Sequence, residues 1–308
     1  MRPSRLVFAS VIVVLASIAT AQKPPSKPAP RGATTMNSLA DMVDQIRNEV
    51  VRVEVTFSNG KSTGTGFFIN TDGMVVTARH VVYPPGISEP AKKIIIQLRM
   101  PTIESKTINV LASWFDYPST VIADDTAHDL VVLKPQSNPF PAIHFIASPK
   151  GNVDIKPVVS RFDAHRLRDG ETVFTSGYPL DLPILITTSG ALASSDPMVY
   201  EQSSDRRYHV EDIYWADIHN NPGNSGGPLF SRTTAAVIGI VLMYKGAPID
   251  FGDGTQGQAN GISKVADPLV VHPLIQNSGI AIILSAKHII ASLEKQVPAI
   301  RYEVVKGY

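Results

Sequence analysis

The 308-residue chain contains no cysteine. A disulfide framework and a thiolate metal site are therefore both excluded. The chain also lacks an excess of positive charge, because 28 lysine and arginine residues are balanced by 27 aspartate and glutamate residues. Domains that bind nucleic acid normally concentrate basic residues on one face, so we expect no nucleic-acid partner. With 44% hydrophobic and 18% charged residues, the composition is that of a globular protein.

The N-terminal apolar run, residues 6–18, is shorter than the roughly 20 residues that span a bilayer. Two arginines precede it, and Ala19-Thr20-Ala21 follows it with the small-x-small pattern of a cleavage site. We therefore predict a signal peptide over residues 1–21 and an exported protein, periplasmic or extracellular. On this prediction the protein meets a membrane only through the signal peptide, before cleavage.

The remaining chain is predicted to contain a linker, one helix near each end and many short strands between the helices. Residues 22–36 are rich in proline, which indicates an extended linker. Apolar residues at helical spacing from Leu39, behind Asn37 or Ser38 as cap, predict one N-terminal helix. A second helix is expected after Ser285 and before Pro298. Alternating or β-branched runs predict strands at residues 51–57, 64–70, 74–77, 93–99, 106–112, 130–133, 171–176, 183–193, 208–218, 233–243 and 280–284.

Two segments lack the clear hydrophobic periodicity of a helix or a strand. Residues 134–170 contain several prolines, and we place a connection between two domains there. Residues 244–278 are rich in glycine and aspartate and are interpreted as an insertion loop, whose role the sequence leaves open. Many short strands with helices only at the two ends favour β-barrels or sandwiches over a βαβ sheet.

A candidate nucleophile, Ser225, lies in the segment NPGNSGGPL, residues 221–229. The flanking glycines permit a tight backbone in which successive amides converge. Attack by a serine hydroxyl needs a base, and the resulting oxyanion needs fixed donors. The amides of Gly223 and Ser225, with Asn224 as a further donor, are the candidate oxyanion hole.

A candidate base, His80, follows the apolar strand MVVTA, at a rigid strand end. Asp129 immediately precedes the apolar run LVVL, where a carboxylate close to the core needs a partner. A neutral His80 can donate one ring N–H to Asp129 and accept the Ser225 proton on the other nitrogen. We therefore expect activity to rise with pH as the imidazole loses its proton.

Three segments, GTGFFI with GMVVTARHVV, HDLVVL and NPGNSGGPL, resemble the trypsin-like, chymotrypsin-fold serine proteases, in particular the HtrA/Deg branch. The resemblance implies an all-β fold of two six-stranded antiparallel β-barrels with an N-terminal and a C-terminal helix. It implies a serine endopeptidase acting on polypeptides, with His80, Asp129 and Ser225 as catalytic residues and no cofactor. The protease domain would span residues 37–297, with the first barrel at about 50–135, the second at about 170–285 and a tail over 298–308.

The resemblance also indicates a substrate pocket formed by one loop and one strand of the second barrel. Its expected lining residues are His219, Asn220, Asn221, Pro222, Ile238, Gly239, Ile240 and Val241. HtrA proteases usually continue into a PDZ domain, but only about a dozen residues follow the last predicted helix, so we expect none. The preferred side chain at the cleaved bond and the oligomeric state stay open.

Two alternatives are weighed against this interpretation. Residues 223–227 also satisfy G-x-S-x-G, the nucleophile elbow of α/β-hydrolases, with later aspartates and His272 or His288 as partners. The β-branched run that follows argues against the elbow, which requires a helix. The other alternative is a protease-fold binding or chaperone-like protein that does not cut.

No metal site is predicted from the remaining histidines. His128 neighbours Asp129, but adjacent strand residues point to opposite faces, which makes it a surface or supporting residue. The others show no metal-ligand spacing with one another. They are His144, His165, His209, His272 and His288.

Overall fold

The computed structural model describes residues 38–103, 110–141, 144–148, 151–155, 157–201, 209–248, 258–259, 272–273 and 275–305. The predicted signal peptide and linker lie outside these residues. Among the residues that are described, no helix combines the length and the apolar character needed to cross a lipid bilayer.

The chain starts with α1 (Leu39–Ile46), as predicted. Ser38 is the N-cap: its hydroxyl accepts a hydrogen bond from the Asp41 amide at 3.1 Å, and the Asp41 carboxylate accepts one from the Ser38 amide at 2.9 Å. This reciprocal capping box satisfies two amides that the first turn leaves without helical partners. Met42 and Ile46, on the apolar stripe, are buried.

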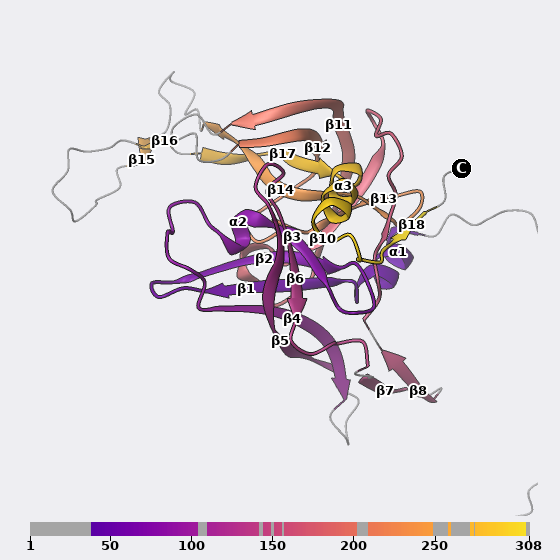
Figure 1. Ribbon diagram of the computed structural model, residues 1–308. Helices are drawn as coiled ribbons and strands as arrows, with labels where there is room; N and C mark the ends of the chain where they lie inside the picture. The colour runs from indigo at the N-terminus through magenta and orange to yellow at the C-terminus, as the bar shows by residue number, and fades with distance from the viewer. Residues whose placement is uncertain are drawn as a thin grey trace, which may run out of the picture. The chain divides into compact units, whose positions relative to one another are not determined.

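Six antiparallel strands form the first closed barrel, in the order β1-β2-β3-β6-β5-β4 (Figure 1). They are β1 (Val50–Thr56), β2 (Lys61–Phe68), β3 (Val75–Ala78), β4 (Lys93–Ile103), β5 (Val110–Asp125) and β6 (Leu130–Pro135). A single helical turn, α2 (Arg79–Val82), follows β3 directly. Alternating burial along β1 places every second side chain in the barrel core.

A second barrel follows in sequence, in the order β13-β10-β11-β12-β17-β14, and the pairing of β13 with β14 closes it. Its strands are β10 (Thr172–Gly177), β11 (Ile186–Glu201), β12 (His209–Asp217), β13 (Pro228–Ser231), β14 (Val237–Pro248) and β17 (Ile275–Ser285). The predicted fold of two six-stranded antiparallel barrels is therefore confirmed, with α3 (Ala286–Gln296) as the C-terminal helix.

Shorter elements complete the chain. β9 (Arg161–Phe162) pairs in parallel with β14, and β18 (Glu303–Val304) pairs in parallel with β9. The segment after Pro298, predicted as a tail, thus adds a strand to the second sheet. The remaining elements are β7 (His144–Ser148), β8 (Gly151–Ile155), β15 (Gln258–Ala259), β16 (His272–Pro273) and the 3₁₀ turn η1 (Pro179–Asp181).

Two loop predictions need correction. The segment 244–278 is not loop at its ends, because β14 continues to Pro248 and pairs there with Ile275 of β17. Antiparallel pairing uses backbone groups, so glycine-rich and polar residues can extend a hairpin without an apolar pattern. Similarly, the connection over 134–170 contains the hairpin of β7 and β8.

One apolar cluster extends through both barrels and α3. It joins Phe67 and Leu133 of the first barrel to Phe230 of the second and to Ile289 and Leu293 of the helix. Burying each such side chain contributes about 1.5–3 kcal/mol relative to exposure. The two barrels are thus held together by a shared core, which fixes the elements that carry the candidate site.

Candidate active site

Asp129 and His80 are joined by two hydrogen bonds. The His80 amide donates to Asp129 Oδ1 at 2.9 Å, and His80 Nδ1 lies 2.6 Å from Asp129 Oδ2. An ionised carboxylate only accepts, so Nδ1 carries the proton in this contact and the tautomer of the ring is set. Asp129 is only 3% exposed, and these bonds satisfy a carboxylate that burial would otherwise disfavour.

The turn between β5 and β6 positions the Asp129 carboxylate. Asp129 has a left-handed backbone, with φ at +53°, and its carbonyl accepts a hydrogen bond from the Arg79 amide at 2.8 Å. Backbone and side chain of Asp129 therefore both bind the first turn of α2. Because α2 begins directly after β3, His80 stands at the rigid end of a barrel strand, where the sequence pattern predicted a base.

Ser225 lies on the loop that leads into β13, between two glycines with positive φ. Gly223 has φ at +97° and Gly226 at +84°, a conformation that favours glycine. A Cβ at Gly226 would overlap Thr77 Oγ1 and would stand 2.7 Å from the Ala78 amide nitrogen. The loop thus presses its backbone against the last residues of β3, which lead directly to His80.

Thr65 of β2 fastens this loop to the first barrel, a role that the sequence analysis missed. Its amide donates to the Ser225 carbonyl at 2.8 Å. Its buried hydroxyl donates to the Gly223 carbonyl at 2.7 Å and accepts from the Tyr178 amide at 3.0 Å. The only sequence signal was a threonine between two glycines in GTG, where close backbone approach is possible.

The amides of the loop divide into two groups. Asn224 donates to the Asn221 carbonyl at 3.0 Å, and Gly226 donates to the Val241 carbonyl at 2.7 Å. Within the part of the chain that the structure describes, the amides of Gly223 and Ser225 have no acceptor. The Asn224 amide is thus used inside the loop, and only the other two proposed oxyanion donors keep their hydrogen-bonding capacity.

The residues predicted to line a substrate pocket fall into two sets. In the loop, His219 and Pro222 are exposed, Asn221 is half-buried and Asn220 is buried. The Asn277 side chain donates to the Asn220 carbonyl, and Thr188 Oγ1 donates to the His219 carbonyl at 2.9 Å, so neighbouring strands hold the loop.

The predicted strand set lies in the core instead. Ile238, Ile240 and Val241 have no exposed surface, and Gly239 packs against the Leu284 backbone. Both faces of β14 are covered here, because Val237, Ile240 and Leu242 belong to one apolar cluster of the described residues and Ile238 and Val241 belong to another. These side chains cannot face a substrate. Val241 instead exchanges backbone hydrogen bonds with Gly226 and Gly227, so β14 supports the Ser225 loop.

The family model of the trypsin-like peptidase domain matches residues 64–240, a range that contains His80, Asp129 and Ser225. The chain belongs to this family. The antiparallel barrels also rule out the α/β-hydrolase alternative, whose nucleophile elbow requires a parallel sheet.

Curated relatives include DegP-like and HtrA proteases. A probable periplasmic serine endoprotease DegP-like of Chlamydia pneumoniae is 30% identical over 180 residues, covering 58% of this chain and 28% of the relative. A protein of the same description from Chlamydia trachomatis is 27% identical over 252 residues, covering 79% and 42%. The serine protease HTRA2 of Bos taurus is 28% identical over 246 residues, covering 77% and 44%. The chain thus spans less than half the length of these relatives.

Solved structures show the same fold. The active form of the Rv3671c protease from M. tuberculosis superposes with a TM-score of 0.54 at 19% identity, covering 93% of this chain and 98% of that one. The HtrA-type protease AlgW with a tripeptide gives 0.50 at 20% identity, covering 85% and 65%. At these identities the likeness concerns the fold alone.

Proposed function

We propose that this protein is an exported serine endopeptidase in which Ser225 is the nucleophile, His80 the general base and acid, and Asp129 the residue that orients His80. The observation that carries the proposal is the pair of hydrogen bonds from His80 to the buried Asp129 carboxylate, at 2.9 and 2.6 Å. An imidazole held at Nδ1 by a carboxylate presents its Nε2 as the proton acceptor.

In the first half-reaction the Ser225 Oγ–H bond breaks, its proton passes to His80 Nε2, and Oγ bonds to the peptide carbonyl carbon. The carbonyl electrons move to oxygen, and the amides of Gly223 and Ser225 stabilise the resulting oxyanion. Collapse of the intermediate breaks the C–N bond, and His80 gives its proton to the leaving amine. An acyl-enzyme and a new N-terminus result.

The second half-reaction repeats these steps with water. His80 removes a proton from the water molecule, whose oxygen attacks the acyl carbon, and the same two amides hold the new oxyanion. The Ser225 Oγ leaves and recovers its proton from His80, which releases the carboxylic acid product. Each step uses only side chains and amides of this chain.

The substrates would be polypeptides bound next to the loop at His219–Pro222, where His219 and Pro222 are exposed. Export is supported by the pattern of residues 1–21 and by the DegP-like relatives, which are named as probable periplasmic serine endoproteases. The side chains of Ile238, Ile240 and Val241 are buried, so in this proposal the substrate contacts the exposed loop residues and not these side chains.

Labelling with a fluorophosphonate and hydrolysis of unfolded casein test the proposal. We expect stoichiometric labelling of Ser225, and loss of both labelling and hydrolysis in Ser225→Ala and His80→Ala, by a factor of about 10⁴ or more in kcat. Ser58→Ala, at the exposed turn between β1 and β2, is the matched control and should leave both unchanged. A folded protein that never labels and never cuts would instead support the binding or chaperone-like alternative.

A further inference from the structure

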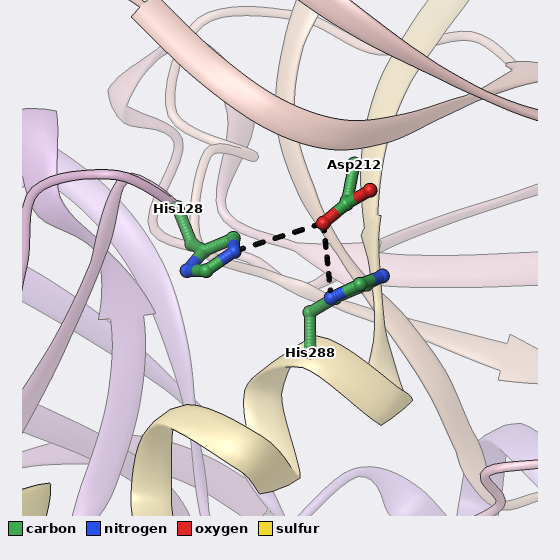
Figure 2. A group of neighbouring side chains, drawn as sticks. All are labelled: His128, Asp212 and His288. Atoms are coloured by element: carbon green, nitrogen blue, oxygen red, sulfur yellow. Dashed lines mark ion pairs between the residues drawn. The ribbon is translucent and has the colours of Figure 1, made fainter. Parts of the chain in front are cut away.

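Three side chains outside the proposed catalytic residues converge where both barrels meet α3. His128 comes from the β5–β6 turn, Asp212 from β12 and His288 from the first turn of α3 (Figure 2). Asp212 Oδ2 lies 3.4 Å from His288 Nδ1 and 4.0 Å from His128 Nε2. The two imidazoles are stacked with ring centroids 5.6 Å apart. One potential ligand atom from each residue therefore faces a common point.

The spacing of these three atoms suits a small divalent cation. All of them lie within 4.8 Å of one another. Bonds of about 2.1 Å at tetrahedral angles place ligand atoms roughly 3.4 Å apart. The Asp212–His288 separation already has this value, and a small rotation of the His128 ring would bring in the third atom. All three residues are half-buried, which leaves room for a water molecule as fourth ligand.

Asp125 prepares His128 as a ligand. The His128 amide donates to Asp125 Oδ1 at 3.3 Å, and His128 Nδ1 lies 3.0 Å from Asp125 Oδ2. A carboxylate oxygen accepts hydrogen bonds, so the contact with Asp125 holds the ring proton of His128 at Nδ1. With its proton held at Nδ1, His128 turns the Nε2 lone pair toward Asp212. A carboxylate behind a histidine is the usual support for a metal-binding imidazole.

His128 Nε2 and the Asp212 carboxylate face each other without a direct hydrogen bond. Their 4.0 Å separation is too long for a hydrogen bond. A lone pair on Nε2 that faces a carboxylate oxygen is repelled unless a cation or proton lies between them.

The backbone of β12 is deformed where it presents Asp212. Between the pairs Met198–Ile213 and Tyr200–Val210, β12 advances by three residues while β11 advances by two. Asp212 sits in this bulge with a left-handed φ of +54°. Bulges re-aim side chains, and strained residues of this kind concentrate at binding sites. Here the bulge directs the carboxylate to the two histidines.

We propose that His128, Asp212 and His288 bind one divalent transition-metal ion, with Zn²⁺ as the preferred ion. Two imidazoles and one carboxylate favour Zn²⁺ over Ca²⁺ or Mg²⁺, which prefer oxygen ligands. The ion would tie the β5–β6 turn to β12 and α3, next to Asp129. The sequence analysis predicted no metal site because the ligands are 84 and 76 residues apart and have no local motif. The site is independent of the proposed peptidase function.

The experiment is a metal titration of the tag-free full chain after removal of metal with a chelator. Calorimetry with Zn²⁺ should show one ion per chain, and Co²⁺ should produce visible absorption bands of a nitrogen- and oxygen-ligated ion. Zn²⁺ should raise the unfolding temperature, because a ligand that binds only the folded state stabilises it. Mg²⁺ at the same concentration should show no stoichiometric binding in calorimetry and should not raise the unfolding temperature.

Variants from separate elements distinguish this site from adventitious binding. Asp212→Asn and His288→Gln should each weaken Zn²⁺ binding by at least tenfold and remove the Co²⁺ bands. His165→Gln is the matched control, because His165 also lies between carboxylates, 2.9 Å from Asp163 and 2.9 Å from Glu171. Its ring nitrogens bind acids on opposite sides, so the variant should keep the affinity within twofold.

Circular dichroism verifies that each variant is folded, and His128→Gln replaces either of the others if one is not. The proposal is overturned if the chain binds no stoichiometric Zn²⁺. It is equally overturned if folded Asp212→Asn, His288→Gln and His128→Gln bind the ion as tightly as the unaltered chain.

Discussion

Asp129 and Glu49 are both buried carboxylates of the first half of the molecule, 3% and 7% exposed. The Asp129 carboxylate accepts two hydrogen bonds from His80, whereas the Glu49 carboxylate accepts one, at 2.8 Å, from the Ser160 hydroxyl. Burial raises the pKa of Glu49 to about 8, although Ser160 and the charge of Arg161 oppose the shift. Glu49 is thus largely protonated at neutral pH.

The difference teaches that burial alone does not make a carboxylate functional. The partner decides the outcome. A hydroxyl leaves Glu49 as a neutral structural group, whereas under the proposed function Asp129 stabilises the imidazolium that forms when His80 accepts the Ser225 proton. Four changes test or sharpen this contrast, from the largest expected effect to the smallest.

The largest effect is expected from Asp129→Asn. An amide in place of the carboxylate can donate to His80 Nδ1 and stabilise the wrong tautomer, so kcat for peptide hydrolysis should fall by about 10⁴. Glu49→Gln, a matched carboxylate-to-amide change, should leave kcat within about twofold. Steady-state peptidase assays measure both. An equal loss of kcat in the two variants would contradict the contrast between Asp129 and Glu49.

Glu49→Gln should instead change the pH dependence of stability. Above pH 4.5 the unfolded chain ionises Glu49, while the folded chain keeps it protonated up to about pH 8, so stability is lost as pH rises across this window. The amide has no such dependence. The free energy of unfolding of the variant, relative to that of the unaltered protein, should rise by roughly 2–4 kcal/mol between pH 4 and pH 8. Urea unfolding at both pH values measures the change, and a constant difference would contradict it.

Ser160→Ala should have a smaller effect. It removes the hydroxyl that donates to Glu49 Oε2 at 2.8 Å, both residues being buried. Leaving a buried acceptor without this donor should lower the free energy of unfolding by about 1–2 kcal/mol. Denaturant unfolding of the single variants and of Ser160→Ala with Glu49→Gln tests the coupling. Strictly additive losses would mean that the two side chains do not interact.

The smallest effect is expected from His165→Gln, beside a third buried carboxylate. Asp163 is 8% exposed and binds His165, whose other ring nitrogen binds Glu171. Although burial opposes it, the hydrogen bonds to Glu171 and Asp163 raise the pKa of His165.

A raised histidine pKa contributes stability that is complete below the unfolded value, about 6.5, and is lost as pH rises through the folded value. His165→Gln should therefore destabilise the protein at pH 6 by about 0.5 kcal/mol and less at pH 9, since the partly exposed pair is screened by solvent. Thermal unfolding at the two pH values measures this. A larger loss at pH 9 would reverse the assignment.

Local patterns predicted the fold well. Alternation along residues 51–57 gave β1, and the residues before Asp41 gave the capped start of α1. Both depend on contacts within a few residues. The extension of β14 to Pro248 was missed because its stabilising contacts are backbone bonds to a strand more than 25 residues away. The burial of Ile238 and Val241 was missed because coverage of both strand faces depends on the whole barrel.

The sequence by itself determined the strands, the terminal helices and the residue types able to perform acyl transfer, since periodicity, capping and glycine placement act within a few residues. The sequence also pointed to the pairing of His80 with Asp129, but only the tertiary structure decided which side chains the neighbouring His128 meets. Asp129 and the adjacent His128 have the same local surroundings, yet one faces His80 and the other faces Asp212 and His288. Their separation follows from a left-handed turn and from barrel closure, which bring together segments that local sequence patterns cannot connect.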